Sequence, residues 1–338
     1  MALFIGVDIG GTKVLATAVS SSGRVLRTAR RTTPGRRVEA RLVEDALTEA
    51  VEEIAGSRRV RAIGIAAAGF VDAQGERVRF APHLPWRDEG VRARLSERWS
   101  APVVLDNDAN CAARAELTYG AVGAADDALV VTLGTGIGGA LVLDGTVHRG
   151  YNGMAGEFGH MQVVPEGRSC ECGGAGCWEQ YTSGNALVRF VRERIGHPDR
   201  RPGSLDAASG GDPDRILGPM VTEAAAAGDP LALEAFASVG EWLGVGLANL
   251  VAAFDPETVV VGGGLSAAGD LLLQPARQAL RASLVGAAHR TVPPVVRAAL
   301  GPEAGAIGAA DLARQTFSLA GSRARARLRA ARGTAPRR

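Results

Sequence analysis

Two glycine-rich stretches, IGVDIGGTK at residues 5–13 and VTLGTGIGG at residues 131–139, decide the fold of this chain. Each joins two apolar runs that have the length and composition of β-strands, with the glycines in the turn between them. The predicted strands cover 3–9 and 14–20 in the first case, and the same strand–glycine–strand order returns over 128–143. Because helix-like stretches alternate with strands in both halves, the sequence predicts two related, layered α/β domains.

The second stretch raises the question of a dinucleotide site, because Gly134, Gly136 and Gly139 formally satisfy the pattern G-x-G-x-x-G. A Rossmann fingerprint needs a helix that opens at the last glycine and an acidic residue about 20 positions on. Here the strand-like run ALVLDGTV follows at once, and the chain has no G-x-x-x-x-G-K-[ST] sequence. Ordinary hairpin turns explain either stretch alone. The pair favours phosphate binding, because glycines leave room for an anion and offer it backbone N–H groups.

Polar residues and a third glycine run extend the phosphate-binding interpretation. Asp8 ends a predicted buried strand, where an unpaired charge is costly unless it faces a cleft or a cation, so we expect Mg²⁺ near it. Lys13 is the only lysine of the chain. The glycine run at 262–264 joins a strand to a helix, which suits an adenosine lying against the backbone.

A cysteine cluster is the most specific signal in the chain. The segment GEFGH ends at His160, and CECGGAGCWE begins at Cys170. Cys172 is close enough to Cys170 to converge with it, and Cys177 returns after a glycine-rich turn. Three cysteines and a histidine are the ligands of a closed structural zinc site, which has no open position for a catalytic water and would fix the loop. Free or disulfide-bonded cysteines are the alternative.

Two further groups of polar residues are candidates for binding a sugar. Glu157 and Glu179 flank the cluster, and a metal-stiffened loop would hold their carboxylates ready for hydrogen bonds to sugar hydroxyls. Surface solvation is the alternative for either glutamate. Asn107 and Asp108 lie between a short strand and a helix, where one of them is expected to cap the helix. The carboxyl edge of a sheet is also where α/β enzymes bind ligands.

A length of 338 residues exceeds the usual size of one hydrophobic core, so we expect two domains with a cleft between them. The expected small α/β domain covers 1–119, and the expected large α/β domain, with the zinc loop, covers 120–302. A last helix at about 303–317 is expected to pack back on the small domain. The Arg-rich segment 318–338 is expected to be a disordered basic tail.

Charge and hydropathy narrow the expected partners and location. The net charge is +2, which gives no reason to expect a nucleic-acid partner. The N-terminus lacks the regions of a signal peptide, and no run of about 18 uncharged apolar residues indicates a membrane span. We therefore expect a cytoplasmic protein with no membrane partner.

The motifs together resemble those of the ROK family of bacterial sugar kinases, and most closely its ATP-dependent glucokinases. IGVDIGGTK and VTLGTGIGG are similar to the two phosphate motifs of the family, VVVGGGLS to its adenosine motif, and GEFGH and CECGGAGCWE to its most diagnostic signatures. The resemblance extends to about residue 316. It implies an α/β, actin-like (ribonuclease H-like) ATPase fold with an interdomain cleft, ATP with Mg²⁺, a structural zinc, a free hexose as substrate, and a homodimer or homotetramer.

The resemblance also implies roles for individual residues. Asp108 is the expected general base, which accepts the proton of a sugar hydroxyl, expected to be O6, as that hydroxyl attacks the γ-phosphorus. The expected sugar-binding residues are Gly69, His83, Asn107, Asp108, Glu157, His160 and Glu179, with His160 also a zinc ligand. The expected ATP-binding residues are Asp8, Gly10, Gly11, Thr12, Lys13, Gly134, Thr135, Gly136, Gly263 and Gly264.

Alternatives to a glucokinase stay open at this point. His83 stands in the segment APHLPW where the family often has asparagine, so fructose, N-acetylglucosamine or N-acetylmannosamine are alternative substrates. A polyphosphate-dependent kinase is less favoured, because that relative lacks the cysteine cluster. An alternative of another class is a sugar-responsive ROK regulator without its DNA-binding domain. Such regulators carry a winged helix before the first glycine hairpin, which begins here at Ile5.

Overall fold

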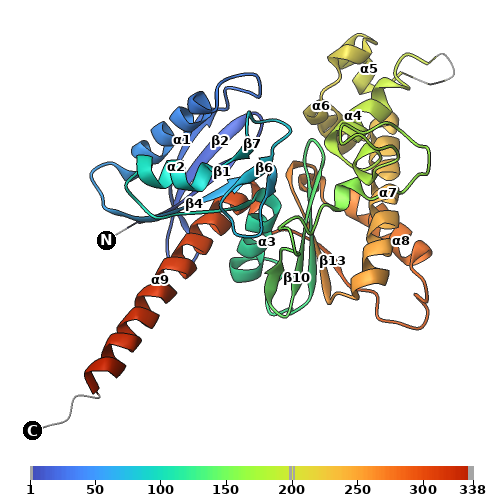
Figure 1. Ribbon diagram of the computed structural model, residues 1–338. Coiled ribbons are helices and arrows are strands. Elements are labelled where there is room, and N and C mark those ends of the chain that lie inside the picture. Colours follow the sequence, from blue (N-terminus) through green and yellow to red (C-terminus); the bar gives the residue numbers. More distant parts are fainter. Residues whose placement is uncertain (1–2, 198–199, 201, 334–338) are drawn as a thin grey trace, which may run out of the picture. The chain divides into compact units, whose positions relative to one another are not determined.

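The computed structural model describes residues 3–197, 200 and 202–333, with side chains described up to residue 318. The chain forms two compact units, and Figure 1 labels their helices and strands. Unit 1 comprises Met1–Tyr119, Arg149–Ala155 and Glu303–Arg338, and unit 2 comprises Gly120–His148 and Gly156–Pro302. Each unit is built on a five-stranded sheet.

The sheet of unit 1 has the strand order β3-β2-β1-β4-β8. Its strands are β1 (Leu3–Ile9), β2 (Lys13–Val19), β3 (Val25–Thr32), β4 (Val60–Ala67) and β8 (Val103–Asn107). The first three strands are antiparallel neighbours, whereas β4 runs parallel to both β1 and β8. The unit also has a small sheet of β5 (Phe70–Val71), β6 (Val78–Phe80) and β7 (Arg87–Glu89). The sequence pattern did not reveal it, because strands of two or three residues carry no periodicity.

Helices cover both faces of this sheet (Figure 1). On one face lie α1 (Ala40–Ala55) and α2 (Val91–Arg98), and on the other α3 (Asp108–Tyr119) and α9 (Ala304–Gly333). Successive residues of β1 point to opposite faces of the sheet. Ile5 and Val7 are fully buried in the apolar core with α1, whereas Gly6 faces α9.

Close packing of α9 on the sheet depends on two glycines that are partners in the β1–β4 register, Gly6 and Gly64. A Cβ atom added to Gly6 would lie 1.8 Å from the carbonyl oxygen of Ala306, and one added to Gly64 would lie 1.8 Å from that of Ala309. Both obstacles are backbone atoms of a helix. The helix backbone therefore lies directly against the strand backbones, and a side chain at either position would force them apart.

The last helix, α9, ends later than the helix expected from the sequence. The sequence pattern ended the last helix at about residue 317 and predicted disorder from 318, whereas α9 continues to Gly333. The segment after residue 317 is rich in alanine and arginine, which are strong helix formers. Their propensity explains the longer helix. Residues 334–338 of the expected tail lie outside the described residues.

Unit 2 repeats the strand order of unit 1 as β11-β10-β9-β12-β13. The strands are β9 (Ala128–Leu133), β10 (Ile137–Leu143), β11 (Thr146–His148), β12 (Thr258–Gly262) and β13 (Val295–Arg297). Again the first three are antiparallel neighbours, and β12 is parallel to both β9 and β13. The repetition expected from the two glycine turns therefore extends to the whole sheet.

Helices α7 (Pro230–Phe254) and α8 (Asp270–Ser283) pack together and share the apolar core of unit 2 with β9 and β12. The remaining helical segments are α4 (Gly184–Arg192), α5 (Ser204–Ser209), α6 (Gly218–Ala226), and the 3₁₀ turns η1 (Phe158–His160), η2 (Trp178–Gln180), η3 (Pro213–Arg215), η4 (Gly264–Ala268) and η5 (Gly301–Glu303). Among the described residues, α7 alone has the length and hydropathy of a membrane span, and 61% of its apolar window is buried. A core helix of a soluble protein passes the same test, so this is weak support for a membrane span.

The segment Arg149–Ala155 belongs to unit 1, although the sequence analysis assigned all of 120–302 to the second domain. Long-range bonds explain the difference. The guanidinium of Arg149 pairs with Asp106 and donates to the carbonyl oxygens of Asp72 and Ala73, all in unit 1. No pattern in the local sequence indicates that the chain returns to unit 1 over these residues.

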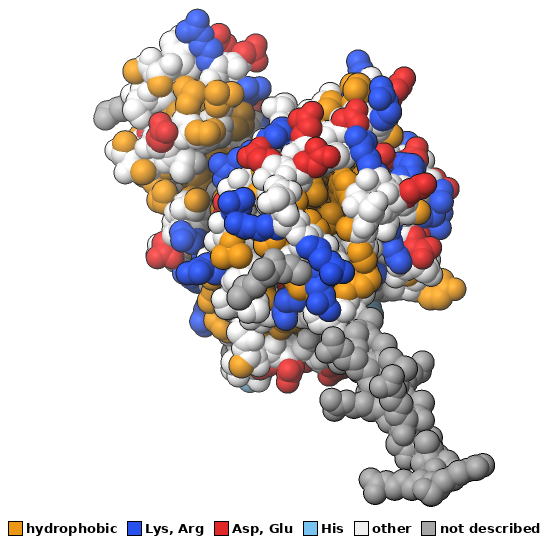
Figure 2. Space-filling model, turned by 90° about the vertical axis from the view of Figure 1, so that its left-hand side faces the viewer, with side chains coloured by type: hydrophobic (Ala, Val, Ile, Leu, Met, Phe, Trp, Pro, Cys, Tyr) orange, Lys and Arg blue, Asp and Glu red, His pale blue; other side chains and the backbone are white. Residues whose placement is uncertain are grey.

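Charges of both signs lie on the surface of unit 1. Arg31 pairs with Glu49 and Glu53, and Arg98 pairs with Asp45. In Figure 2, basic and acidic side chains are interspersed over the visible face. Exposed pairs of this kind contribute little to stability each, about 0–1 kcal/mol.

The packing of α9 gives a first prediction. Gly64→Ala should destabilise the protein by about 1–3 kcal/mol or more, because the new methyl group overlaps a helix carbonyl that cannot move alone. Urea unfolding followed by circular dichroism measures this. Gly10→Ala, after the end of β1, is the control, since its Cβ would meet nothing within 4 Å. Equal unfolding midpoints for the two variants would contradict the packing.

Candidate active site

Asp108 begins α3 directly after β8, and its neighbour Asn107 caps that helix. The Oδ1 atom of Asn107 accepts hydrogen bonds from the backbone N–H groups of Ala109, at 2.9 Å, and Asn110, at 3.1 Å. Its Nδ2 atom donates to the carbonyl oxygen of Gly69 at 3.1 Å. Asn107 is therefore the capping residue of the pair, and it also joins the start of α3 to Gly69.

Two carboxyl groups of unit 1, those of Asp108 and Asp8, have raised pKa values. Burial raises the pKa of Asp108 to about 6, although hydrogen bonds from backbone N–H groups and from Asn107 oppose the shift. Burial, and then the charge of Asp108, raise the pKa of Asp8 to about 7, and Lys13 opposes that shift. Carboxylates with raised pKa values are typical of functional sites, and Asp108 is poised to accept a proton near neutral pH.

An ion pair that was not predicted from the sequence supports the junction between β8 and α3. One oxygen of Asp106, Oδ1, accepts from the backbone N–H of Asn107 at 2.8 Å, from Nδ2 of Asn110 at 3.2 Å and from Nε of Arg149 at 3.1 Å. Asp106 directly precedes the Asn-Asp pair, so its position in the sequence could have marked it. Arg149 has no such signal, because it is 43 residues away from Asp106.

The first glycine turn is held by its carbonyl groups. Thr33 donates through its backbone N–H to the carbonyl oxygen of Thr12 at 3.1 Å, and through Oγ1 to that of Gly10 at 2.8 Å. Within the described part of the chain, the N–H groups of Gly11 and Thr12 donate to no protein group. A Cβ added to Gly11 would lie 2.5 Å from Cβ of His83, so His83 packs directly on this turn.

The second turn is bounded by a carboxylate. A Cβ added to Gly136 would lie 2.4 Å from Oε2 of Glu179, and that oxygen accepts from the N–H of Ile137 at 3.4 Å. Gly139, which formally completed the dinucleotide pattern, instead packs on Phe158, whose ring a Cβ would meet at 2.3 Å. The structure therefore supports the rejection of the Rossmann interpretation.

At three glycines, two in these turns and one after β12, the space inside the protein would accommodate a side chain. Gly10, Gly134 and Gly264 would each carry a Cβ that meets no atom within 4 Å, and none has a positive φ. Gly263 differs, since its φ is +80° and a Cβ would lie 2.3 Å from the carbonyl oxygen of Leu133. Open glycines in the two turns and after β12 are consistent with a ligand that approaches the backbone closely.

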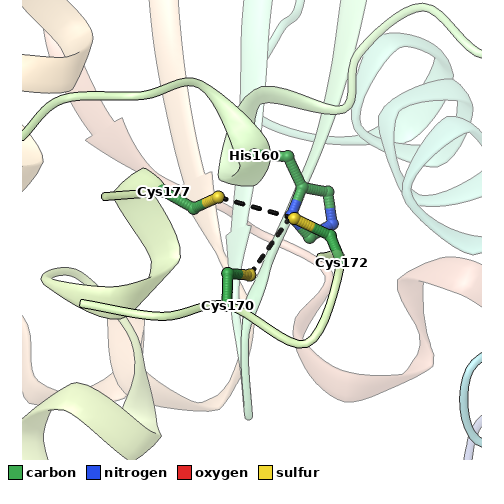
Figure 3. Close-up of side chains that lie close together, drawn as sticks. All are labelled: His160, Cys170, Cys172 and Cys177. Carbon is green, nitrogen blue, oxygen red and sulfur yellow. Dashed lines mark hydrogen bonds between the residues drawn. The ribbon is translucent and has the colours of Figure 1, made fainter. Parts of the chain in front are cut away.

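Four potential metal ligands converge in unit 2, as the sequence predicted. The ligand atoms of His160, Cys170, Cys172 and Cys177 all lie within 4.8 Å of one another (Figure 3). The sulfur atoms of Cys172 and Cys177 are 3.6 Å apart, and Nδ1 of His160 is 3.8 Å from Sγ of Cys170. Zn–S bonds of about 2.3 Å in a tetrahedron give ligand separations of about 3.8 Å. The geometry thus fits a metal ion.

The protonation chemistry of the cluster also fits a cation. Burial first, and then the hydrogen bond to Glu179, raise the pKa of Cys170 to about 12. A thiol with this pKa stays protonated at neutral pH unless a metal ion stabilises its thiolate. Cys111, in contrast, is buried in unit 1 beside Ala66 and Ala309, as expected of a core cysteine.

The expected sugar-binding residues of unit 2 lie around this cluster. Glu179 follows Cys177 in η2, and its Oε1 accepts from Sγ of Cys170 at 3.2 Å. His160 turns Nδ1 toward the cluster, which leaves Nε2 for another partner. Glu157 precedes η1, and its carbonyl oxygen accepts from the N–H of His160.

Comparison with known proteins places this arrangement in a family. The model of the ROK family matches residues 4–316. The chain belongs to the ROK family. The "Glucokinase" of Streptomyces coelicolor is 43% identical over 315 residues, which cover 93% of this chain and 98% of that protein.

Solved ROK structures share the fold. A ROK family glucokinase from Streptomyces griseus, solved in complex with glucose and AMPPNP, has a TM-score of 0.85 and 44% identity, covering 93% of this chain and 100% of that chain. A ROK hexokinase from Thermus thermophilus has a TM-score of 0.71 and 35% identity, covering 94% and 99%. These neighbours confirm the predicted two-domain, actin-like ATPase fold for this ROK protein.

The cysteine cluster gives a second prediction. The purified protein should hold about one divalent metal ion per chain, and Cys172→Ser should hold far less, because one of four ligands is lost. Elemental analysis after dialysis measures both. Cys111→Ala is the matched control and should retain the metal. Equal metal content in Cys172→Ser and Cys111→Ala would exclude the cluster as the binding site.

Proposed function

We propose that this protein is an ATP-dependent glucokinase, which transfers the γ-phosphoryl group of ATP to O6 of glucose. The observation that carries the proposal is the half-buried carboxylate of Asp108, whose pKa is raised to about 6 at the capped start of α3. The 43% identity to a glucokinase over nearly the whole chain supports the same reaction.

Asp108 accepts the proton of the attacking hydroxyl. Its Oδ1 atom accepts a hydrogen bond from the N–H of Ala109 at 2.9 Å, which holds the carboxylate in place. A base with a pKa near 6 is mostly ionised at neutral pH and yet basic enough to take a proton as the new O–P bond forms. Burial therefore tunes this group for its role.

The glycine turns bind the phosphates. Backbone N–H groups of Gly11 and Thr12, the hydroxyl of Thr12 and the ammonium of Lys13 offer donors to phosphoryl oxygens on which negative charge develops. Open positions at Gly10 and Gly134 let phosphate oxygens reach the backbone. Asp8 would hold Mg²⁺, which supplies positive charge to the β- and γ-phosphates when it is bound with ATP.

The cysteine cluster is proposed to hold zinc in a structural role. Three thiolates and one imidazole favour Zn²⁺, and all four positions of the tetrahedron are taken by protein atoms. The metal would fix His160 and Glu179 on one rigid loop. We propose that Nε2 of His160 and the carboxylates of Glu157 and Glu179 bind sugar hydroxyls, together with Asn107 and Gly69.

Among the alternatives, kinases for fructose, N-acetylglucosamine or N-acetylmannosamine depend on His83, which is exposed and lies against Gly11. The ROK regulator is not favoured, because two glucokinases are 43% and 44% identical to this chain along nearly their full length. A coupled ADP-release assay across the four sugars distinguishes the kinases. A gel shift with DNA from upstream of the gene tests the regulator.

We also propose a cytoplasmic homodimer or homotetramer with no nucleic-acid or membrane partner. None of the four cysteines forms a disulfide in the structure, which is typical of proteins in a reducing compartment. Light scattering after size-exclusion chromatography measures the oligomeric state.

Removal of the base gives a third prediction. Asp108→Asn should lower kcat by about 10²–10⁴-fold, because no group then takes the hydroxyl proton, while glucose binding measured by calorimetry persists. In the wild-type protein, kcat at saturating Mg-ATP should fall below about pH 6 as Asp108 becomes protonated. Near wild-type turnover by Asp108→Asn would show that Asp108 is not the general base.

The open glycines give a fourth prediction. Gly10→Ala should keep the wild-type unfolding midpoint but raise KM for ATP about tenfold or more, because the methyl group occupies space that the phosphates need. Gly90→Ala is the control, since its nearest neighbour is the flexible side chain of Arg77 at 3.5 Å. An unchanged KM in Gly10→Ala would show that no phosphate approaches this turn.

A further inference from the structure

The ion pair between Arg149 and Asp106 lies outside the expected substrate contacts, yet it is built into the support of Asp108. The side chain of Asp106 is only 5% exposed, and that of Arg149 is 24% exposed. A buried carboxylate and a guanidinium are costly to desolvate, and a pair of this kind is weak evidence for a role in stability alone. The partners of each group indicate what the pair does.

Each of the three guanidinium nitrogen atoms of Arg149 donates a hydrogen bond to a different acceptor. Nε pairs with Oδ1 of Asp106 at 3.1 Å, Nη1 donates to the carbonyl oxygen of Ala73 at 2.7 Å, and Nη2 donates to that of Asp72 at 3.0 Å. The planar guanidinium therefore fixes the end of β8 relative to the turn that follows β5. A lysine ammonium is a point charge and cannot reproduce this fork.

Asp106 connects Arg149 to the residues on either side of Asp108. The oxygen that meets Arg149 also accepts from the N–H of Asn107 and from Nδ2 of Asn110, one turn into α3. Asn107 in turn caps α3 and bonds Gly69. The groups on both sides of Asp108 are thus held by a chain of hydrogen bonds that starts at Arg149.

We propose that Arg149 is a positioning residue for phosphoryl transfer, which acts through Asp106 and Asn107 to hold Asp108 in the geometry that proton transfer requires. It touches no substrate. This inference rests on the proposed kinase function with Asp108 as base. Misplacement of a reacting group by about 1 Å costs about 10²-fold in rate, so loss of the fork acts on kcat.

The test compares Arg149→Lys with Arg94→Lys. Arg94 is a matched control in the same unit: it bonds Glu44 through Nε and Nη2 and Glu89 through Nη1, away from Asp108. Arg149→Lys should lower kcat with ATP and glucose about 10–10²-fold with little change in KM for ATP. Arg94→Lys should change the unfolding midpoint and leave kcat unchanged.

Two further readouts separate positioning from stability. The acid limb of the kcat profile should move to higher pH in Arg149→Lys, because a loosened α3 start weakens the hydrogen bonds that oppose the rise in the pKa of Asp108. If Arg149→Lys fails to fold, Arg149→Ala is assayed with added guanidinium, which should restore part of kcat where ammonium does not.

The outcomes distinguish the inference from the function on which it rests. Wild-type protein without ATP-dependent phosphorylation of any of the four sugars overturns the proposed function. Active wild-type protein with equal kcat in Arg149→Lys, or with equal losses in Arg149→Lys and Arg94→Lys, overturns the positioning role alone.

Discussion

The parallel register of β1, β4 and β8 is the constraint on which the chemistry of unit 1 depends. Asp8 pairs with Ala66 across one strand boundary, and Ala66 pairs with Asp106 across the next. The ends of β1 and β8 therefore lie at one edge of the sheet, and Asp108 follows two residues later. Residues about a hundred positions apart in sequence come close enough for the charge of Asp108 to raise the pKa of Asp8. A register shift by one residue would turn these side chains to the opposite face.

Glycines serve two separate purposes in this fold. Gly6 and Gly64 let a helix backbone lie against strand backbones, and Gly136 leaves room for the carboxylate of Glu179. A Cβ atom at Gly10 or Gly134 would meet nothing within 4 Å, which fits the proposed approach of phosphate to these two turns. The sequence pattern treated all these glycines alike. Only the distances from each missing Cβ separate glycines that have a packing reason within the protein from glycines that have none.

The cysteine cluster of unit 2 and the carboxylate junction of unit 1 were predictable to different degrees. His160, Cys170, Cys172 and Cys177 lie within eighteen consecutive residues, so a short loop brings them together whatever the rest of the chain does. The sequence also placed Asn107 and Asp108 between a strand and a helix. It left open which of them caps the helix, because that depends on which side-chain oxygen the first turn of α3 meets.

The sequence by itself determined the repeated strand–glycine–strand pattern, the family resemblance and the cluster of three cysteines and a histidine, because each is a local pattern with a local physical cause. Tertiary structure alone decided the rest. Arg149 reaches acceptors 43, 76 and 77 residues away, so nothing near it in sequence marks its role. The pKa of Asp108 likewise depends on burial by segments distant in the chain. Long-range packing sets both the position and the basicity of this carboxylate.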